Sequence, residues 1–214
     1  MDPYNFLLKV LIYAPSVIFA ITLHEAAHGY VARHFGDTTA YMLGRVTLNP
    51  IKHIDPIGTI VVPLITSLAG FVFGWAKPVP VNFNNLRNPK RDMFWVAAAG
   101  PASNVIQALI WALVAKTLFD VDGGVATYWV QVAEAGILVN LILAILNLFP
   151  ILPLDGGRIL ASLLPARISH AYQGTERYGM LILIVLIVTG VLGWVMRPIL
   201  LLGVSAIYAL FGLS

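Results

Sequence analysis

Long apolar runs, separated by short polar stretches, make up most of the chain. A helix that spans a bilayer needs about 20 mostly apolar residues. Runs that approach or exceed this length lie at about residues 6–32, 57–74, 93–118, 126–149, 178–196 and 198–213. This pattern predicts an all-α polytopic membrane protein with about five to six transmembrane helices.

Three stretches depart from the pattern of plain membrane helices. The run 57–74 has Pro63 in its middle, which leaves open whether it crosses the membrane or re-enters it. Residues 38–50 are rich in β-branched side chains and are interrupted by Gly44, so they predict a short pair of strands. Residues 75–91 carry prolines at alternate positions, and we expect them to be extended.

Composition supports a membrane location and a single domain. The chain is 59% hydrophobic and 11% charged, whereas a soluble domain carries about 25% charged residues. Its net charge is +3, and the basic residues lie scattered between apolar runs. This distribution fits the positive-inside rule of membrane proteins better than nucleic-acid binding, so we expect no nucleic-acid partner. There are no cysteines, so a metal would have to be held by nitrogen and oxygen. We find no linker, and we expect one membrane-embedded domain over residues 1–214.

The first apolar run ends with several ionisable residues, which are unusual in a membrane-spanning helix. His24, Glu25 and His28 follow a stretch in which Lys9 is the sole formal charge. An ionisable group inside a bilayer costs about 2.5–3.5 kcal/mol on insertion scales and by default marks a functional site. On a helix, His24 and His28 lie one turn apart and can hold one metal ion. Glu25 can then face a water on that metal, which is the H-E-x-x-H arrangement of zinc hydrolases.

A catalytic zinc needs a third protein ligand and an open position. Asp155 is the best candidate, because Pro150 and Pro153 keep the chain before it extended and Gly156 after it permits close backbone approach. The alternative is that Asp155 merely caps a helix that begins at Gly156. Glu134 is a rival acid, but it lies in the middle of a predicted helix.

Three motifs together resemble the site-2 proteases, intramembrane zinc metalloproteases that cut transmembrane segments of other proteins. The motifs are H-E-A-A-H at residues 24–28, G-P-A-S-N at residues 100–104, and N-L-F-P-I-L-P-L-D-G at residues 147–156. The resemblance covers residues 6–160, taken as the zinc core, and the helices at 178–213 are additional. The chain resembles the minimal form of the family, without an inserted PDZ domain.

The resemblance implies a set of roles around a bound Zn²⁺. His24, His28 and Asp155 would be the ligands, and Glu25 would activate the zinc-bound water. Asn147 could hydrogen-bond the developing oxyanion or the substrate backbone. Asn104 could act in the same way or hold helices together. The partners would be transmembrane protein substrates in the lipid bilayer.

If His24 and Asp155 bind the same metal ion, both must lie on the same side of the membrane, and this requirement constrains the topology. His24 and Asp155 come to the same side of the membrane only if the chain returns between the first and third long runs. With that return, residues 33–92 and 151–177 share a side and contain ten of the thirteen Lys and Arg residues. The positive-inside rule then favours a re-entrant element, an external N-terminus and an active site toward the cytosol of a prokaryotic cell.

A bound substrate must unwind locally, because a transmembrane helix hides its carbonyls in its own hydrogen bonds. The freed backbone groups need partners in lipid, and an edge strand near the active site would supply them. Residues 41–48 of the predicted small β element are the first candidate for this strand. Residues 77–81 are the second.

The competing interpretation is a non-proteolytic transporter or ion-path protein that uses His and Asp residues. It predicts polar residues spread over several helices, whereas here they concentrate in two motifs with metal-ligand spacing. His53 and Asp55 could form a second polar site, although a surface turn is the preferred interpretation. We expect His170 to be interfacial.

Overall fold

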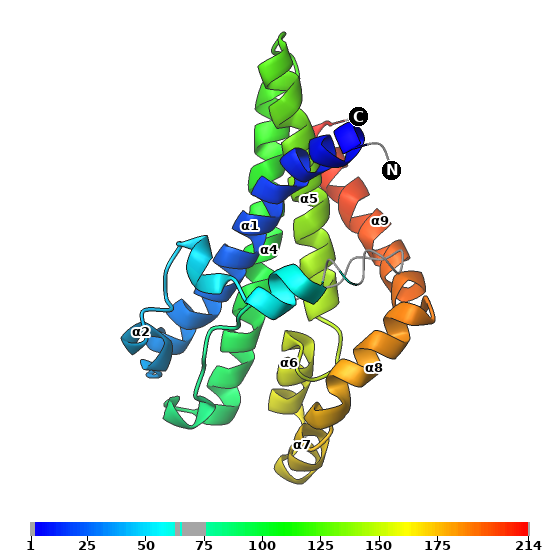
Figure 1. The fold of residues 1–214 in the computed structure, drawn as a ribbon. Coiled ribbons are helices and arrows are strands. Elements are labelled where there is room, and N and C mark those ends of the chain that lie inside the picture. The colour runs from blue at the N-terminus through cyan, green and yellow to red at the C-terminus, as the bar shows by residue number, and fades with distance from the viewer. Residues whose placement is uncertain (1–2, 63–64, 66–75, 214) are drawn as a thin grey trace.

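The computed structural model describes residues 3–62, 65 and 76–213, and the regular elements within these ranges are helical (Figure 1). Helices α1 (Pro3–His34), α4 (Pro89–Leu118), α5 (Gly124–Asn147) and α9 (Val191–Phe211) contain stretches that are long and apolar enough to cross a membrane. The described part of the chain thus holds four candidate membrane spans. The expectation of a helical membrane protein is confirmed, although with fewer candidate spans than the five to six predicted.

Helices α1, α4 and α5 pack against one another at the centre of the bundle (Figure 1). Their interfaces are built from small side chains, among them Ala20 of α1, Ala112 of α4 and Gly136 of α5. Small residues let the backbones of membrane helices approach closely, which increases dispersion contacts in a solvent that gives no hydrophobic driving force. An apolar cluster joins α9 to α4 and α5; its buried members are Ala108, Ala112, Ile137, Leu141 and Ile207.

The elements that carry the polar motifs meet at one end of this bundle. The chain leaves α1 and returns to begin α4 at the same place, since the Arg87 N–H donates to the Phe35 carbonyl at 2.9 Å. Between these points lie α2 (Thr39–Met42), η1 (Pro50–His53), η2 (Pro56–Val61) and η3 (Phe83–Asn85). Below α5 in Figure 1, the short helices α6 (Asp155–Leu163) and α7 (Ala166–Gln173) lie at this same end.

The predicted strand pair at residues 38–50 is wrong, because the described residues contain no strand there or elsewhere. Asp37 accepts hydrogen bonds from the backbone and hydroxyl of Thr39, the first residue of α2. Gly44, at a φ of +61°, ends it, and the Arg45 N–H donates back to the Ala40 carbonyl at 2.9 Å. Local side-chain and turn hydrogen bonds here outweigh the β propensity of the sequence. The first candidate edge strand, residues 41–48, is therefore lost.

The C-terminal runs divide at a different place from the one predicted. The run 178–196 is interrupted at Gly190, which adopts a left-handed conformation with a φ of +75°. As a result, α8 (Glu176–Val188) has 13 residues and is too short to span. Helix α9 begins at Val191 and contains Pro198 in its interior instead of starting there.

Two expectations concern the segment before α4. Of the predicted extended stretch 75–91, residues 76–82 form no helix or strand, as their prolines predict. The rest of the prediction is wrong, because η3 lies within this stretch and α4 begins at Pro89. Most of the run 57–74 lies outside the described residues; its described beginning is η2, a π-helical turn capped by Asp55. The prediction that this run re-enters the membrane remains a prediction.

Packing of α4 against α5 depends on the missing side chain at Gly136. A Cβ at Gly136 would lie 2.5–2.6 Å from ring atoms of Trp111. We expect Gly136→Ala to lower the free energy of unfolding by about 1–3 kcal/mol, the usual cost of overpacking. Gly193→Ala in α9 is the matched control, because nothing lies within 4 Å of its Cβ position, and it should be neutral or slightly stabilising. Thermal unfolding in one detergent would test this; equal stability of both variants would contradict it.

Candidate metal centre

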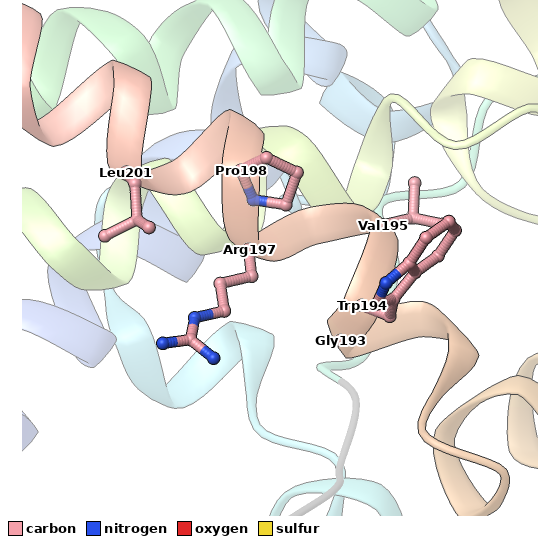
Figure 2. A pocket seen from close by; sticks show the side chains of 6 residues that line it. All are labelled: Gly193, Trp194, Val195, Arg197, Pro198 and Leu201. Carbon is pink, nitrogen blue, oxygen red and sulfur yellow. The ribbon is translucent and has the colours of Figure 1, made fainter.

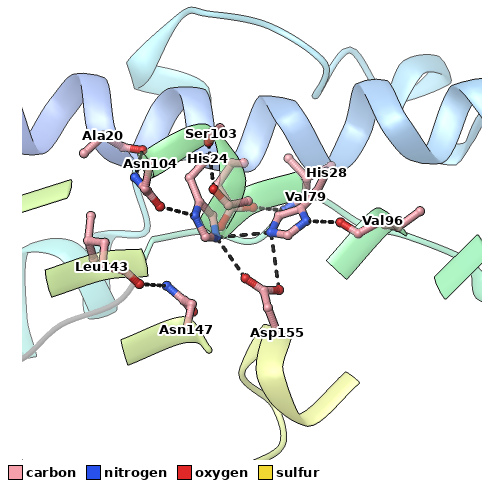
Figure 3. A network of polar contacts seen from close by, with 12 residues as sticks. Ala20, His24, His28, Val79, Val96, Ser103, Asn104, Leu143, Asn147 and Asp155 are labelled. Atoms are coloured by element: carbon pink, nitrogen blue, oxygen red, sulfur yellow. Dashed lines mark hydrogen bonds and ion pairs between the residues drawn. The ribbon is translucent and has the colours of Figure 1, made fainter. Parts of the chain in front are cut away.

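Three side chains from two helices converge at the end of the bundle where α1, α4 and α6 meet (Figure 3). The Nε2 atoms of His24 and His28 lie 3.1 Å apart. His24 Nε2 is 3.2 Å from Asp155 Oδ2, and His28 Nε2 is 3.3 Å from Asp155 Oδ1. Among the described residues, this is the one group of three or more His, Asp or Glu side chains close enough to share a metal ion.

Local sequence explains how each helix presents its side chain. His24 and His28 are four residues apart on α1 and therefore lie on one face. Asp155 is the first residue of α6, and its carboxylate faces the imidazoles while Leu154 occupies the capping position without a side-chain hydrogen bond. Asp155 therefore does not act as the cap of a helix that begins at Gly156.

Of the two features predicted around Asp155, the close backbone approach at Gly156 is present, and the extended segment before Asp155 is absent. A Cβ at Gly156 would collide with the carbonyls of Leu148 and Phe149, so the predicted close backbone approach is confirmed. Residues 150–154 form successive turns instead of an extended segment, with the Leu154 N–H donating to the Ile151 carbonyl at 2.9 Å. These turns return the chain toward α1.

Hydrogen bonds on the far side of each imidazole determine which nitrogen faces the centre. His24 Nδ1 donates to Asn104 Oδ1 at 2.6 Å, and His28 Nδ1 donates to the Val96 carbonyl at 2.7 Å. A carbonyl oxygen can only accept, so each neutral ring carries its hydrogen on Nδ1 and presents the Nε2 lone pair inward. The Asn104 amide is itself oriented, because its nitrogen donates to Ala20 O at 3.2 Å and to Asn140 Oδ1 at 2.9 Å.

Two lone pairs and a carboxylate that face one another need a cation between them. The buried Asp155 Oδ2 has no hydrogen-bond partner among the described residues, although His24 Nε2 lies 3.2 Å away. Zinc–ligand distances of 2.0–2.2 Å in a tetrahedral site put the ligand atoms about 3.3–3.6 Å apart, close to the separations seen here. The observed separations of 3.1–3.3 Å and the two-nitrogen, one-carboxylate donor set fit Zn²⁺ with a position left open.

Glu25 lies beside this cluster but outside it. Its Oε2 accepts a hydrogen bond from the Val79 backbone N–H at 2.7 Å, and the residue is half-buried. Glu25 follows His24 directly on α1 and is not part of the donor set. A carboxylate in this place can accept a proton from a water molecule.

The two candidate asparagines occupy different places. Asn104 contacts His24 with its oxygen, and both described acceptors of its nitrogen are internal, so it has no donor directed at the open position. Asn147 lies at the end of α5 and donates to the Leu143 carbonyl at 3.0 Å. The structure does not bring Asn147 into the hydrogen bonds of the cluster (Figure 3).

Two further residues support the centre and were not singled out from the sequence as supporting residues. Asn140 is fully buried and orients Asn104; an amide alone in the apolar stretch of residues 137–143 is a signal that could have revealed it. Gly100 leaves room for the imidazoles, because a Cβ there would lie 2.6 Å from His24 Nε2 and collide with His28 Nε2. Gly100 belongs to the G-P-A-S-N motif.

The other histidines and a separate hollow take no part in the centre. His53 is buried and donates from Nε2 to the Thr47 carbonyl at 2.9 Å, and His170 is exposed on α7. Asp55 caps η2. Figure 2 shows a hollow along α9 whose lining does not include any residue of the cluster; it is lined by Gly193, Trp194, Val195, Arg197, Pro198 and Leu201.

Comparison with known proteins points to one family. The sequence model described as "Peptidase family M50" matches residues 117–190. "Putative zinc metalloprotease YwhC" of Bacillus subtilis (strain 168) is 40% identical over 200 residues, which cover 92% of this chain and 89% of that protein. "Putative zinc metalloprotease Rip2" of Mycolicibacterium smegmatis is 32% identical over 174 residues, which cover 80% of this chain and 64% of that protein. No solved structure gives a significant match.

Asn104 and Asn147 give a matched test of the hydrogen bonds around the centre. We expect Asn104→Ala to weaken zinc binding about 10–100-fold, because His24 loses the acceptor that holds its ring and tautomer. Asn147→Ala should leave zinc affinity unchanged, since Asn147 does not contact either histidine. Competition titration against a chelator in detergent measures both. Equal affinities in the two variants would contradict the assignment of Asn104.

Proposed function

The chain belongs to peptidase family M50 and is an intramembrane zinc metalloprotease, and we propose that it hydrolyses peptide bonds within or near transmembrane segments of membrane-protein substrates. The family assignment confirms the resemblance to site-2 proteases. The observation that carries the proposal is the convergence of two imidazole lone pairs and one carboxylate beside a glutamate that is not part of the donor set.

His24, His28 and Asp155 are the proposed ligands of the zinc ion. The outer hydrogen bonds of both rings support this role, because they hold the histidines in the tautomer that a metal requires. When bound, zinc would supply Lewis acidity that polarises the scissile carbonyl and lowers the pKa of water toward about 7. The half-buried Asp155 carboxylate completes the donor set from the other side.

Glu25 is the proposed general base and then general acid. One oxygen of its carboxylate is held by Val79, which leaves Oε1 to take the proton of the attacking water. The same carboxyl group can then give this proton to the leaving amine, so the reaction returns Glu25 to its starting state. This role needs a group next to the ligands that is not itself a ligand.

The asparagines have separate proposed roles. The Asn147 amide nitrogen uses one hydrogen for Leu143, and its second hydrogen is available for a developing oxyanion or for the substrate backbone. Asn104 is better described as a positioning residue for His24, because its oxygen is the part that contacts the centre.

Clustering of the polar groups favours a protease over a transporter or ion path. A path would place ionisable residues along several helices, whereas the described residues contain one group of three or more such side chains that could hold a metal ion. The whole of residues 1–214 is proposed as one domain, with its zinc core at 6–160. Contact of α9 with α4 and α5 supports inclusion of the C-terminal helices.

The proposed location is a prokaryotic cell membrane, with the active site toward the cytosol and the N-terminus outside. The contact between Arg87 and Phe35 supports a return of the chain to one side before α4. Ten of the thirteen Lys and Arg residues would then face the cytosol. The run 57–74 would re-enter the membrane.

Glu25→Gln separates the base from the ligands. The variant keeps the length of the side chain and should retain zinc, but cleavage should fall about 10²–10⁴-fold, because an amide cannot accept the proton. Asp155→Ala and His24→Ala should lose both zinc and cleavage. Metal analysis of purified protein, with proteomic comparison of membranes for accumulated transmembrane fragments, measures the two properties. Full cleavage by Glu25→Gln would overturn the mechanism, and normal zinc in Asp155→Ala would remove Asp155 from the ligands.

Single cysteines can test the orientation, because the chain has no cysteine of its own. Asn49→Cys and Asn88→Cys replace exposed residues on either side of the run 57–74. Both should react with an impermeant thiol reagent in inside-out vesicles and not in intact cells. Labelling of the two positions from opposite faces would exclude the re-entrant topology.

A further inference from the structure

A proline-rich segment lies against α1 beside the metal centre and is held there by its backbone. Residues 77–82, called the strap below, have the sequence K-P-V-P-V-N. At the first end, the Lys77 N–H donates to the His53 carbonyl at 2.9 Å. The Arg45 guanidinium donates to the carbonyl of Lys77 at 2.9 Å and to that of Pro78 at 3.3 Å. These bonds fix the entry of the strap.

The second end of the strap is fixed by Asp37, which follows α1. Asp37 Oδ2 accepts from the Asn82 N–H at 2.7 Å, and Oδ1 accepts from Thr39 and from the Asn85 amide. Burial by itself would raise the pKa of Asp37, but the hydrogen bonds from Thr39, Asn82 and Asn85 outweigh it and hold the pKa below its ordinary value. Asp37 therefore remains a charged anchor at neutral pH.

The middle of the strap is aligned with Glu25. The Val79 side chain is 7% exposed and packs over Gly29, where an added Cβ would lie 3.3 Å from Val79 Cγ1. Gly29 is one helical turn beyond Glu25, so this packing sets the register of the strap on α1. In that register the Val79 N–H meets Glu25 Oε2 at 2.7 Å.

The flanking prolines make this contact specific. Pro78 and Pro80 have no N–H, so Val79 supplies the one backbone donor of the Pro-Val-Pro stretch, and the structure directs it at Glu25. Prolines also restrict the backbone of the stretch. A hydrogen bond to an ionised carboxylate is stronger than one between neutral groups.

We propose that Val79 is a positioning residue, whose backbone N–H holds Oε2 of Glu25 so that Oε1 is presented for proton transfer. A glutamate has several rotatable bonds, and a misplacement of about 1 Å in a reacting group can cost about 100-fold in rate. The strap removes this freedom from a side chain that no other described residue hydrogen-bonds. The inference rests on the proposed role of Glu25 as the base.

A proline substitution removes the donor while keeping the extended backbone. In the zinc-loaded full-length protein, acting on a transmembrane reporter that the wild type cleaves, Val79→Pro should lower kcat about 10–100-fold, with KM and zinc content unchanged. Val81→Pro is the matched control in the same strap, since the Val81 amide donates to no described residue, and it should lose far less kcat than Val79→Pro. Val79→Ala, which retains the N–H, should lose less kcat than Val79→Pro.

Other roles for the strap give different results. A rise in kcat for Val79→Pro would mean that the strap blocks the centre, and a rise in KM at constant kcat would mean that it holds substrate. Equal loss of kcat in Val79→Pro and Val81→Pro would mean a general structural role. Each of these outcomes overturns the proposal. A wild type that binds no zinc and cleaves no reporter would instead count against the proposed function.

Hydrogen exchange tests the contact without relying on activity. Because prolines have no amide hydrogen, Val79 is the one exchangeable backbone amide between Pro78 and Pro80, so a peptide that spans them reports on it directly. Glu25→Ala should accelerate exchange at Val79 about tenfold, which corresponds to the loss of one hydrogen bond. The Asn82 amide, bound to Asp37, should be unchanged. Equal protection of Val79 in Glu25→Ala and in the wild type would overturn the proposal.

Discussion

Burial of His24 and His28 inside an apolar helical bundle is the constraint on which the rest of the structure depends. Lipid offers no hydrogen-bond partners, so each buried polar atom must find one within the protein. The outward nitrogen of each ring does so on α4, at Asn104 and at the Val96 carbonyl. The inward nitrogens are then left facing each other and Asp155, an arrangement that a shared metal ion would satisfy. The hydrogen bonds that α4 makes to the outer nitrogens of both rings thus direct the inner nitrogens toward Asp155, where they form the candidate metal centre.

Close helix packing follows from the same constraint. The imidazoles can reach α4 only if its backbone approaches α1, and Gly100 leaves the necessary space. Small residues elsewhere on α1, α4 and α5 keep the backbones close along their length. Asn140 of α5 completes the arrangement by orienting Asn104. The central helices are therefore both the membrane scaffold and the outer support of the proposed zinc ligands.

The polar segments at one end of the bundle serve the chemistry in a different way. Asp37 and Arg45 fix a chain segment that has no regular secondary structure of its own. That segment brings a backbone N–H to Glu25 across 54 residues of sequence. An intramembrane protease has to keep a charged base in a defined orientation next to lipid, and a short anchored segment between two prolines is suited to that task.

The sequence by itself determined the chemistry and the helical class. The period of α1 places His24 and His28 on one face whatever the rest of the chain does, and the apolar runs specify membrane helices. Asp155 could be named from its glycine and proline neighbours, but its approach through turns depends on contacts with the end of α5. Helix α2 and the break at Gly190 were missed, because local hydrogen bonds and one backbone conformation decided them against the residue pattern. Only the tertiary structure could pair Asn104 with His24 or Val79 with Glu25, since contacts between residues far apart in the chain leave no periodic signal in the sequence.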